Sequence, residues 1–142
     1  MNLVNLVERC RRESDFDPFF ESIPFARYLG IRAHMEAGIL VTTLAFRERN
    51  IGNPALPALH GGVIGSLLET AAILQLLWEH ETDKIPKTIN LTVDYLRPGA
   101  PRDTFARGVI SKQGRRVANV SVESWQEHPE MPIASANCHF LL

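Results

Sequence analysis

One stretch of the sequence, residues 59–78, limits what the whole chain can fold into. It reads LHGGVIGSLLETAAILQLLW, and from Val63 onward nearly every position is apolar. A helix with apolar side chains on all sides has no face for water and is normally buried. The stretch therefore predicts a core helix over residues 60–80. The only carboxylate within it, that of Glu69, is the first residue that needs an explanation.

Length and charge exclude several classes of protein. A chain of 142 residues suits one domain with a single core, and its formal net charge of -1 argues against a nucleic-acid partner. The longest apolar run is shorter than the ~20 residues that cross a bilayer, and no signal-peptide pattern opens the sequence. Cys10 and Cys138 show neither metal-ligand spacing nor a disulfide framework. We expect a cytoplasmic protein without a membrane partner or a bound metal.

The N-terminal residues, 1–29, predict a helical extension. Residues 2–13 place their apolar side chains on one helical face, which predicts a helix that docks by that face. Residues 14–30 combine prolines with several aromatic side chains, a composition typical of a packed turn or a short helix. The core of the domain is therefore expected over residues 30–142.

Strand signals cover most of that core. Two runs, 31–36 and 39–46, flank Ala37-Gly38 and predict a hairpin, and an irregular loop rich in proline leads from it to the core helix. Four strand-like runs follow the helix, at residues 87–96, 104–111, 115–127 and 133–141. The turns between them are short, so neighbouring strands should be antiparallel. We predict an α+β fold in which one curved antiparallel sheet wraps around one long central helix.

Local motifs accompany this layout: the pair Asn53-Pro54, the triplet His60-Gly61-Gly62, the carboxylate of Glu69 nine positions after the histidine, and the strand TINLTVDYLRP at residues 88–98. Together they resemble the hotdog fold, and within it the PaaI-like acyl-CoA thioesterases of the 4-hydroxybenzoyl-CoA thioesterase superfamily. The resemblance covers roughly residues 30–142. It implies hydrolysis of an acyl-CoA thioester to a free acid and CoA, with CoA as part of the substrate and no cofactor.

The resemblance also implies roles for individual residues. The N–H group of Gly61 would polarise the thioester carbonyl, while Glu69 of a partner chain would activate water or attack directly. Thr88, on the strand after the helix, would assist. Asn53 would hold His60, but this chain has one residue more between them than the family usually has, which makes Asn50 an alternative.

The chemistry of the helix supports these assignments independently. The first N–H groups of a helix are unpaired donors at the positive end of its dipole, so Gly61 and Gly62 can form an oxyanion site. Glu69 lies eight residues after Gly61, which is about 12 Å along the axis. Both groups therefore cannot touch one carbonyl within one chain. This distance predicts a two-fold homodimer with shared active sites, and two dimers could pair further into a tetramer.

Each of these roles has a structural alternative. Glu69 could pair with an arginine such as Arg97 across the dimer interface, and His60 could simply hydrogen-bond the preceding loop. Thr88 could be present only because threonine favours β-strands. Basic residues in the turns around the later strands are candidates for binding CoA phosphates, although they could also be solvated turn charges. They are Arg97, Arg102, Lys112, Arg115 and Arg116.

Two other functions remain open. Hotdog dehydratases also combine a histidine with a helix carboxylate, so an enoyl-CoA hydratase or hydroxyacyl dehydratase is one alternative. A non-catalytic acyl-CoA binding module is the other. A serine hydrolase is disfavoured because Ser66 lies in no G-x-S-x-G motif.

Overall fold

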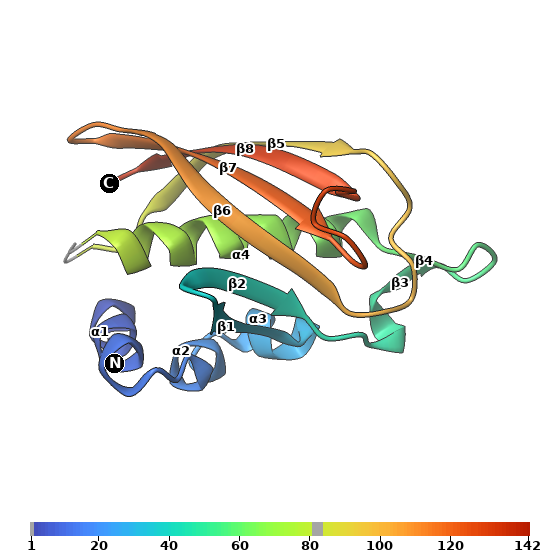
Figure 1. Cartoon of the computed structure of the whole chain (residues 1–142), viewed down its shortest axis with the longest axis horizontal. Helices are drawn as coiled ribbons and strands as arrows, with labels where there is room; N and C mark the ends of the chain where they lie inside the picture. The colour runs from blue at the N-terminus through green and yellow to red at the C-terminus, as the bar shows by residue number, and fades with distance from the viewer. Residues whose placement is uncertain (1, 81–83) are drawn as a thin grey trace.

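The central helix of the protein lies along the concave face of a curved sheet (Figure 1). The structure is a computed structural model and describes residues 2–80 and 84–142. Helix α4 (Gly61–Glu79) is wrapped by a six-stranded antiparallel sheet with the order β1-β2-β6-β7-β8-β5. Its strands are β1 (Ile31–Glu36), β2 (Ile39–Leu44), β5 (Lys87–Tyr95), β6 (Thr104–Gln113), β7 (Val117–Trp125) and β8 (Ala134–Leu141). The predicted hotdog architecture is confirmed.

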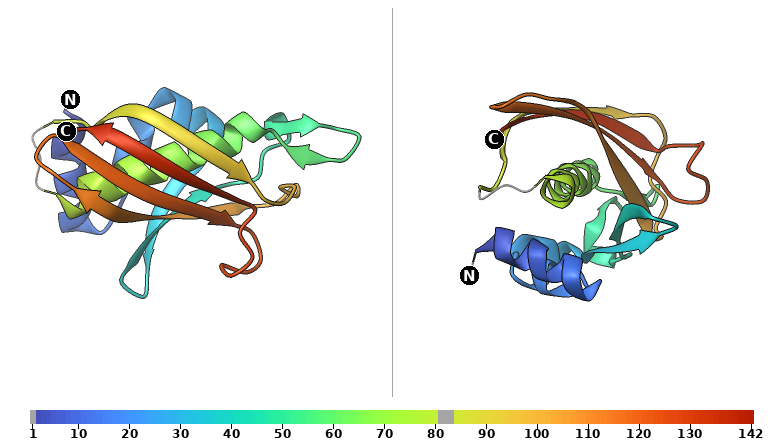
Figure 2. Two further views of the ribbon diagram at one scale, coloured as in Figure 1. Left: turned by 90° about the horizontal axis from the view of Figure 1, so that it is seen from above. Right: turned by 60° about the vertical axis from the view of Figure 1, so that its left-hand side comes forward.

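Three N-terminal helices cover the side of α4 that faces away from the sheet (Figure 2). They are α1 (Leu3–Glu13), α2 (Asp17–Glu21) and α3 (Pro24–Leu29). The amide oxygen of Asn2 caps α1 by accepting the Val4 N–H at 2.9 Å. At the other end of α1, the Arg11 guanidinium donates to the carbonyls of Leu77 and Trp78 and lies over the Trp78 ring. A cation at these carbonyls stabilises the C-terminal end of the α4 dipole.

Helix α4 is buried because its apolar side chains leave few positions for water. Leu67, Leu68, Ala72 and Leu74 have no exposed surface. By length and mean hydropathy α4 could also cross a membrane, but 56% of that window is buried inside the protein, as expected of a core helix. The predicted limits of 60–80 agree with the observed ones to within one residue.

The close packing of α4 on the sheet depends on one glycine of β6. A Cβ on Gly108 would lie 3.2 Å from the Cβ of Gln75 and 3.5 Å from the carbonyl oxygen of Ala71, both on α4. A larger side chain at this position would push the helix away from the sheet.

Two details differ from the expectations drawn from the sequence. The loop before α4 is not wholly irregular: it contains the short helix η1 (Glu48–Asn50) and a two-stranded ladder of β3 (Ile51–Asn53) and β4 (Ala58–Leu59). Strands β5 and β6, although joined by a short segment, are not neighbours, because β5 pairs with β8 and β6 pairs with β2. The connecting segment instead crosses the start of α4, where the Leu59 N–H donates to the Gly99 carbonyl at 2.9 Å.

We predict that Gly108→Val lowers the free energy of unfolding by about 1–3 kcal/mol, the usual cost of overpacking a filled core. Urea unfolding followed by circular dichroism measures the change. Gly114→Val is the control, since the nearest atom to a Cβ there is 3.5 Å away, an ordinary contact. Equal losses in both variants would contradict the proposed packing role of Gly108.

Candidate active site

The first turn of α4 leaves one backbone donor free. The ring Nδ1 of His60 accepts the Gly62 N–H at 2.9 Å, so His60 caps the helix with its side chain. The His60 carbonyl accepts the N–H groups of Val63 and Ile64 at 3.0 and 3.2 Å. In the described part of the chain the Gly61 N–H has no such partner. Of the two glycines predicted to form an oxyanion site, only Gly61 therefore has an unused N–H group.

His60 fits its place because two glycines leave room for it. A Cβ on Gly62 would lie 3.0 Å from His60 Nδ1, and a Cβ on Gly52 would lie 2.8 Å from the His60 Cα. The second contact is with the backbone and could not be relieved by a rotation of a side chain. The sequence analysis did not single out this contact of Gly52, because Gly52 and His60 come together only through the pairing of β3 with β4.

Asn50, rather than Asn53, holds the loop before the helix. Asn50 is buried; its side-chain amide donates to the Leu29 carbonyl at 2.9 Å, and its own carbonyl accepts the His60 N–H at 2.8 Å. The side-chain oxygen of Asn53 accepts the Ala55 N–H at 3.0 Å instead. Among the described residues, no hydrogen bond joins Asn53 to the His60 ring.

Glu69 lies on a half-buried stripe of α4 together with Val63, Ser66, Thr70 and Ile73. The two hydroxyl groups of this stripe bond within the helix: Ser66 donates to the Gly62 carbonyl at 2.8 Å and Thr70 to the Ser66 carbonyl at 2.7 Å. Over residues 2–80 and 84–142, Glu69 itself takes part in no hydrogen bond or ion pair. Its carboxylate is therefore available to a substrate or to a second chain.

The alternative partner of Glu69, Arg97, is engaged elsewhere within the chain. Its guanidinium donates to the Pro132 carbonyl at 2.6 Å. Among the described residues Glu69 therefore has no counter-ion within its own chain. The alternative ion pair with Arg97 was predicted across a dimer interface, and it stays a prediction.

Cys138 lies on the inner face of β8 and interacts electrostatically with Glu69. Burial, and to a lesser degree repulsion of a thiolate by the Glu69 carboxylate, raises the pKa of the Cys138 thiol to about 11. His139, next to it, bonds Asn90 at 2.6 Å through its Nδ1. The two neighbours point to opposite faces of the strand, so a cysteine–histidine nucleophile pair is excluded, as the alternation along a strand predicts.

Thr88 and the start of α4 lie at different ends of β5. Tyr95, the last residue of this strand, donates its hydroxyl to the Gly61 carbonyl at 2.7 Å. Thr88 lies seven residues earlier, which corresponds to about 23 Å along a strand. One chain does not bring Thr88 to Gly61, so its predicted assistance would require a second subunit. Tyr95 had no recognised role in the sequence analysis; its only signal was an aromatic residue at a strand end.

The basic residues expected at the CoA phosphates fall into two groups within the chain. Arg97 and Arg102 precede β6, and Arg102 forms an ion pair with Glu127. Lys112, Arg115 and Arg116 belong to the turn region at the opposite end of β6, about 30 Å away along a strand of ten residues. Within a single subunit β6 separates these two turns, so the five residues do not form one cluster; their contact with CoA phosphates stays a prediction.

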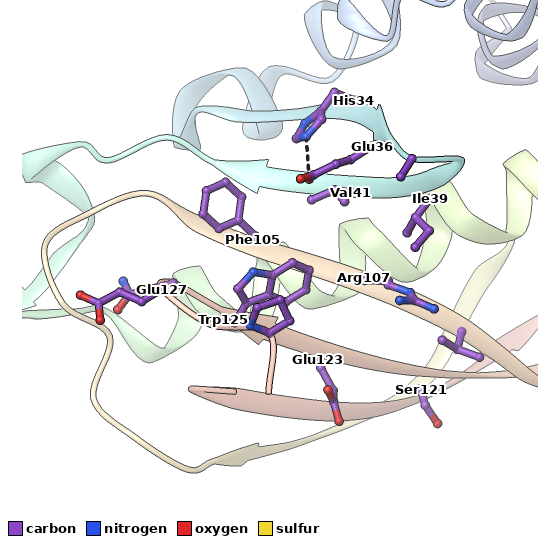
Figure 3. A pocket seen from close by; sticks show the side chains of 14 residues that line it. His34, Glu36, Ile39, Val41, Phe105, Arg107, Ser121, Glu123, Trp125 and Glu127 are labelled. Atoms are coloured by element: carbon purple, nitrogen blue, oxygen red, sulfur yellow. Dashed lines mark hydrogen bonds and ion pairs between the residues drawn. The ribbon is translucent and has the colours of Figure 1, made fainter. Parts of the chain in front are cut away.

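A cavity of about 960 Å³ lies on the outer face of the sheet, away from α4 (Figure 3). Phe105 and Trp125, with ring centroids 6.1 Å apart, lie on its floor. None of the predicted site residues lines it. No group of three or more potential metal ligands occurs among the residues that the structure describes.

Comparisons with known proteins agree with this fold. A family model described as the thioesterase superfamily matches residues 56–133. The medium/long-chain acyl-CoA thioesterase YigI of Escherichia coli K12 is 35% identical over 139 residues, which cover 87% of this chain and 88% of that protein. A solved protein from Chromobacterium violaceum, 36% identical, superposes with a TM-score of 0.78 over 96% of this chain and 95% of its own. A Bacillus halodurans protein solved with CoA shares the fold at 19% identity, with a TM-score of 0.78 over 99% of this chain and 91% of that one.

The raised pKa of Cys138 predicts a pH dependence of stability. Unfolding returns the thiol toward its ordinary pKa of 9.0, so between pH 9 and about 11 the unfolded state binds fewer protons than the native state. Stability should therefore fall as the pH rises through this interval. Urea unfolding at several pH values should show a shallower fall for Cys138→Ala than for the unmodified chain. Identical slopes would contradict burial of the neutral thiol as their cause.

Proposed function

The chain belongs to the thioesterase superfamily, and on this premise we propose that it hydrolyses medium- or long-chain acyl-CoA thioesters with Glu69 as base or nucleophile. The observation that carries this assignment is the half-buried Glu69 carboxylate, which has no partner among the described residues. A carboxylate that no ion pair or hydrogen bond stabilises is costly to place on a core helix. Such a group is therefore expected where it has a function. The chain length of the acyl group is taken from the YigI relatives, which are named for it.

The reaction needs a donor for the carbonyl oxygen and a group that delivers the attacking oxygen. We assign the donor to the Gly61 N–H, which lies at the positive end of α4 and is not used by the helix cap. Glu69 either takes a proton from the attacking water or attacks the carbonyl carbon itself. In the first route the tetrahedral intermediate collapses to the free acid, the C–S bond breaks, and the proton that Glu69 took from water leaves on the CoA sulfur as a free thiol. In the second route C–S cleavage leaves a mixed anhydride on Glu69 and a CoA thiolate that takes a proton from water. A water molecule then hydrolyses the anhydride, which releases the free acid and restores the carboxylate.

A shared dimer site follows from the distance between these two groups. They lie eight residues apart on one straight helix, about 12 Å, so Gly61 of one subunit must work with Glu69 of another. The surface beside them supports such a dimer. The outer edge of β5 has no neighbouring strand in the sheet, and Ile89, Tyr95 and Leu96 on or next to it are each more than half exposed. An edge strand with exposed apolar side chains is suited to pair with another chain.

The remaining candidate residues keep supporting roles in this proposal. Thr88 would approach the site from the partner subunit, and Arg97, Arg115 and Arg116 remain candidates for binding CoA phosphates. Gly62 would act through its missing side chain, because its N–H is bonded to His60. The basic residues form two groups at opposite ends of β6. One chain can therefore contribute only one of these groups to any single CoA site.

We predict that Glu69→Gln lowers kcat for acyl-CoA hydrolysis about 100-fold or more, the loss expected when a general base or nucleophile is removed. The assay is release of free CoA thiol from butyryl-, octanoyl-, lauroyl- and palmitoyl-CoA. Glu123→Gln, an exposed carboxylate on the outer face of the sheet, is the control and should keep full activity. Equal rates for Glu69→Gln and the control would refute the assignment, and water loss from a 3-hydroxyacyl-CoA without thiol release would indicate a dehydratase.

Mixed dimers test the shared site. Gly61→Pro removes the proposed N–H donor at a helix position where proline is tolerated, while Gly61→Ala adds a Cβ and keeps the N–H. We expect Gly61→Pro to lose activity about 100-fold and Gly61→Ala to lose much less. Subunits of Gly61→Pro mixed with Glu69→Gln should recover part of the activity, since one of the two sites then contains both intact groups. Exchanged but inactive mixtures would refute a site shared between chains.

A further inference from the structure

A chain of hydrogen bonds joins Tyr95 to the exposed side of His60. The Tyr95 hydroxyl donates to the Gly61 carbonyl at 2.7 Å. The same peptide unit ends in the Gly62 N–H, which donates to His60 Nδ1 at 2.9 Å. One peptide group is therefore held at both ends, by a side chain 34 positions away in the sequence and by the capping histidine.

This arrangement fixes which ring nitrogen of His60 carries the proton. A nitrogen that accepts a backbone N–H cannot itself carry hydrogen, so the neutral ring must be protonated at Nε2. The cap and a doubly protonated ring are incompatible, because two N–H groups would then face each other. The Nε2–H is thus a donor on an exposed residue directly before the free Gly61 N–H.

Tyr95 strengthens this state in two ways. A hydrogen bond to a peptide carbonyl polarises the peptide and makes its N–H a better donor, so the Tyr95 bond reinforces the bond to His60. The Tyr95 ring also packs against the first turn of α4: a Cβ on Gly61 would lie 3.3 Å from the Cζ and Oη atoms of Tyr95. The backbone after Tyr95 is anchored in turn, since the N–H groups of Leu96 and Arg97 both donate to the Ile133 carbonyl.

Nothing in the fold requires the hydroxyl for burial. Within one subunit Tyr95 is 54% exposed, so the fold of the subunit does not need the bond to Gly61 to satisfy this hydroxyl. The ring alone, as in phenylalanine, would keep the apolar contact with the first turn. The hydroxyl therefore acts mainly on the peptide that it holds.

We propose that Tyr95 is a positioning residue for thioester hydrolysis: through the Gly61–Gly62 peptide it holds His60 as an Nε2–H donor and fixes the first turn of α4, which carries the Gly61 N–H donor. The proposal rests on the proposed thioesterase function for the role of these donors. The state of the His60 ring is independent of that function. No proton is transferred along the chain; the hydrogen bonds only fix the peptide plane and the ring.

Tyr95→Phe tests the proposal, with Tyr28→Phe as the matched control. These are the only tyrosines of the chain, and Tyr28 is 54% exposed as well but packs its ring against Arg49. Long-range ¹H–¹⁵N spectra of the histidine rings at mildly alkaline pH report the tautomer, and the His60 signals are assigned by their loss in His60→Asn. Thioester hydrolysis is measured on the same samples, and urea unfolding verifies that both variants fold.

We expect the unmodified chain and Tyr28→Phe to show the Nε2–H pattern for His60. Tyr95→Phe should show a shift of His60 toward a mixture of tautomers and a kcat lower by roughly tenfold, with KM within about twofold, as for a misplaced rather than a missing group. A wild-type His60 pattern in Tyr95→Phe would overturn the proposal, whatever the rate. Absence of thioesterase activity in the unmodified chain would refute the proposed function, while the tautomer spectra would still decide whether Tyr95 holds His60.

Discussion

Enclosure of α4 is the constraint on which the rest of this structure depends. A helix of 19 residues with apolar side chains on most sides cannot remain in water, and burial of each large side chain contributes about 1.5–3 kcal/mol. The sheet covers one side of α4 and the N-terminal helices cover the other. Arg11 donates hydrogen bonds to carbonyls at the C-terminal end of the helix. Gly108 lets the helix approach the sheet closely. Every other feature of the site takes its position from this helix.

The same enclosure leaves two places where α4 is accessible. One is its first turn, where the cap by His60 uses all but one of the early donors. The other is the half-buried stripe around Glu69, which the chain's own strands and helices do not cover fully. Both places carry groups suited to act on a thioester, a free N–H and a free carboxylate. The helix keeps these two groups apart, and the proposed completion of the site by a second copy of the chain rests on this separation.

Local signals predicted much of the fold. The apolar run, the alternating strands and the glycine and proline breaks located α1, α4 and the strands of the six-stranded sheet to within a few residues, because these signals depend on neighbouring residues alone. They did not show the short elements of the loop before α4. The order of the strands was less accessible. The short link between β5 and β6 suggested a hairpin, but the segment crosses the start of α4 and places β5 beside β8. Packing around the helix, which acts between distant residues, decided this.

For the site, the sequence by itself determined the candidate groups and their separation: Gly61 and Glu69 on one helix, too far apart for one carbonyl. Helical rise is a constant, so this conclusion needed no tertiary contact. Only the tertiary structure decided that Asn50 rather than Asn53 holds the loop, and that Tyr95 reaches Gly61. A hydrogen bond depends on where two groups come to lie in space, and that is set by the packing of elements that are far apart along the chain.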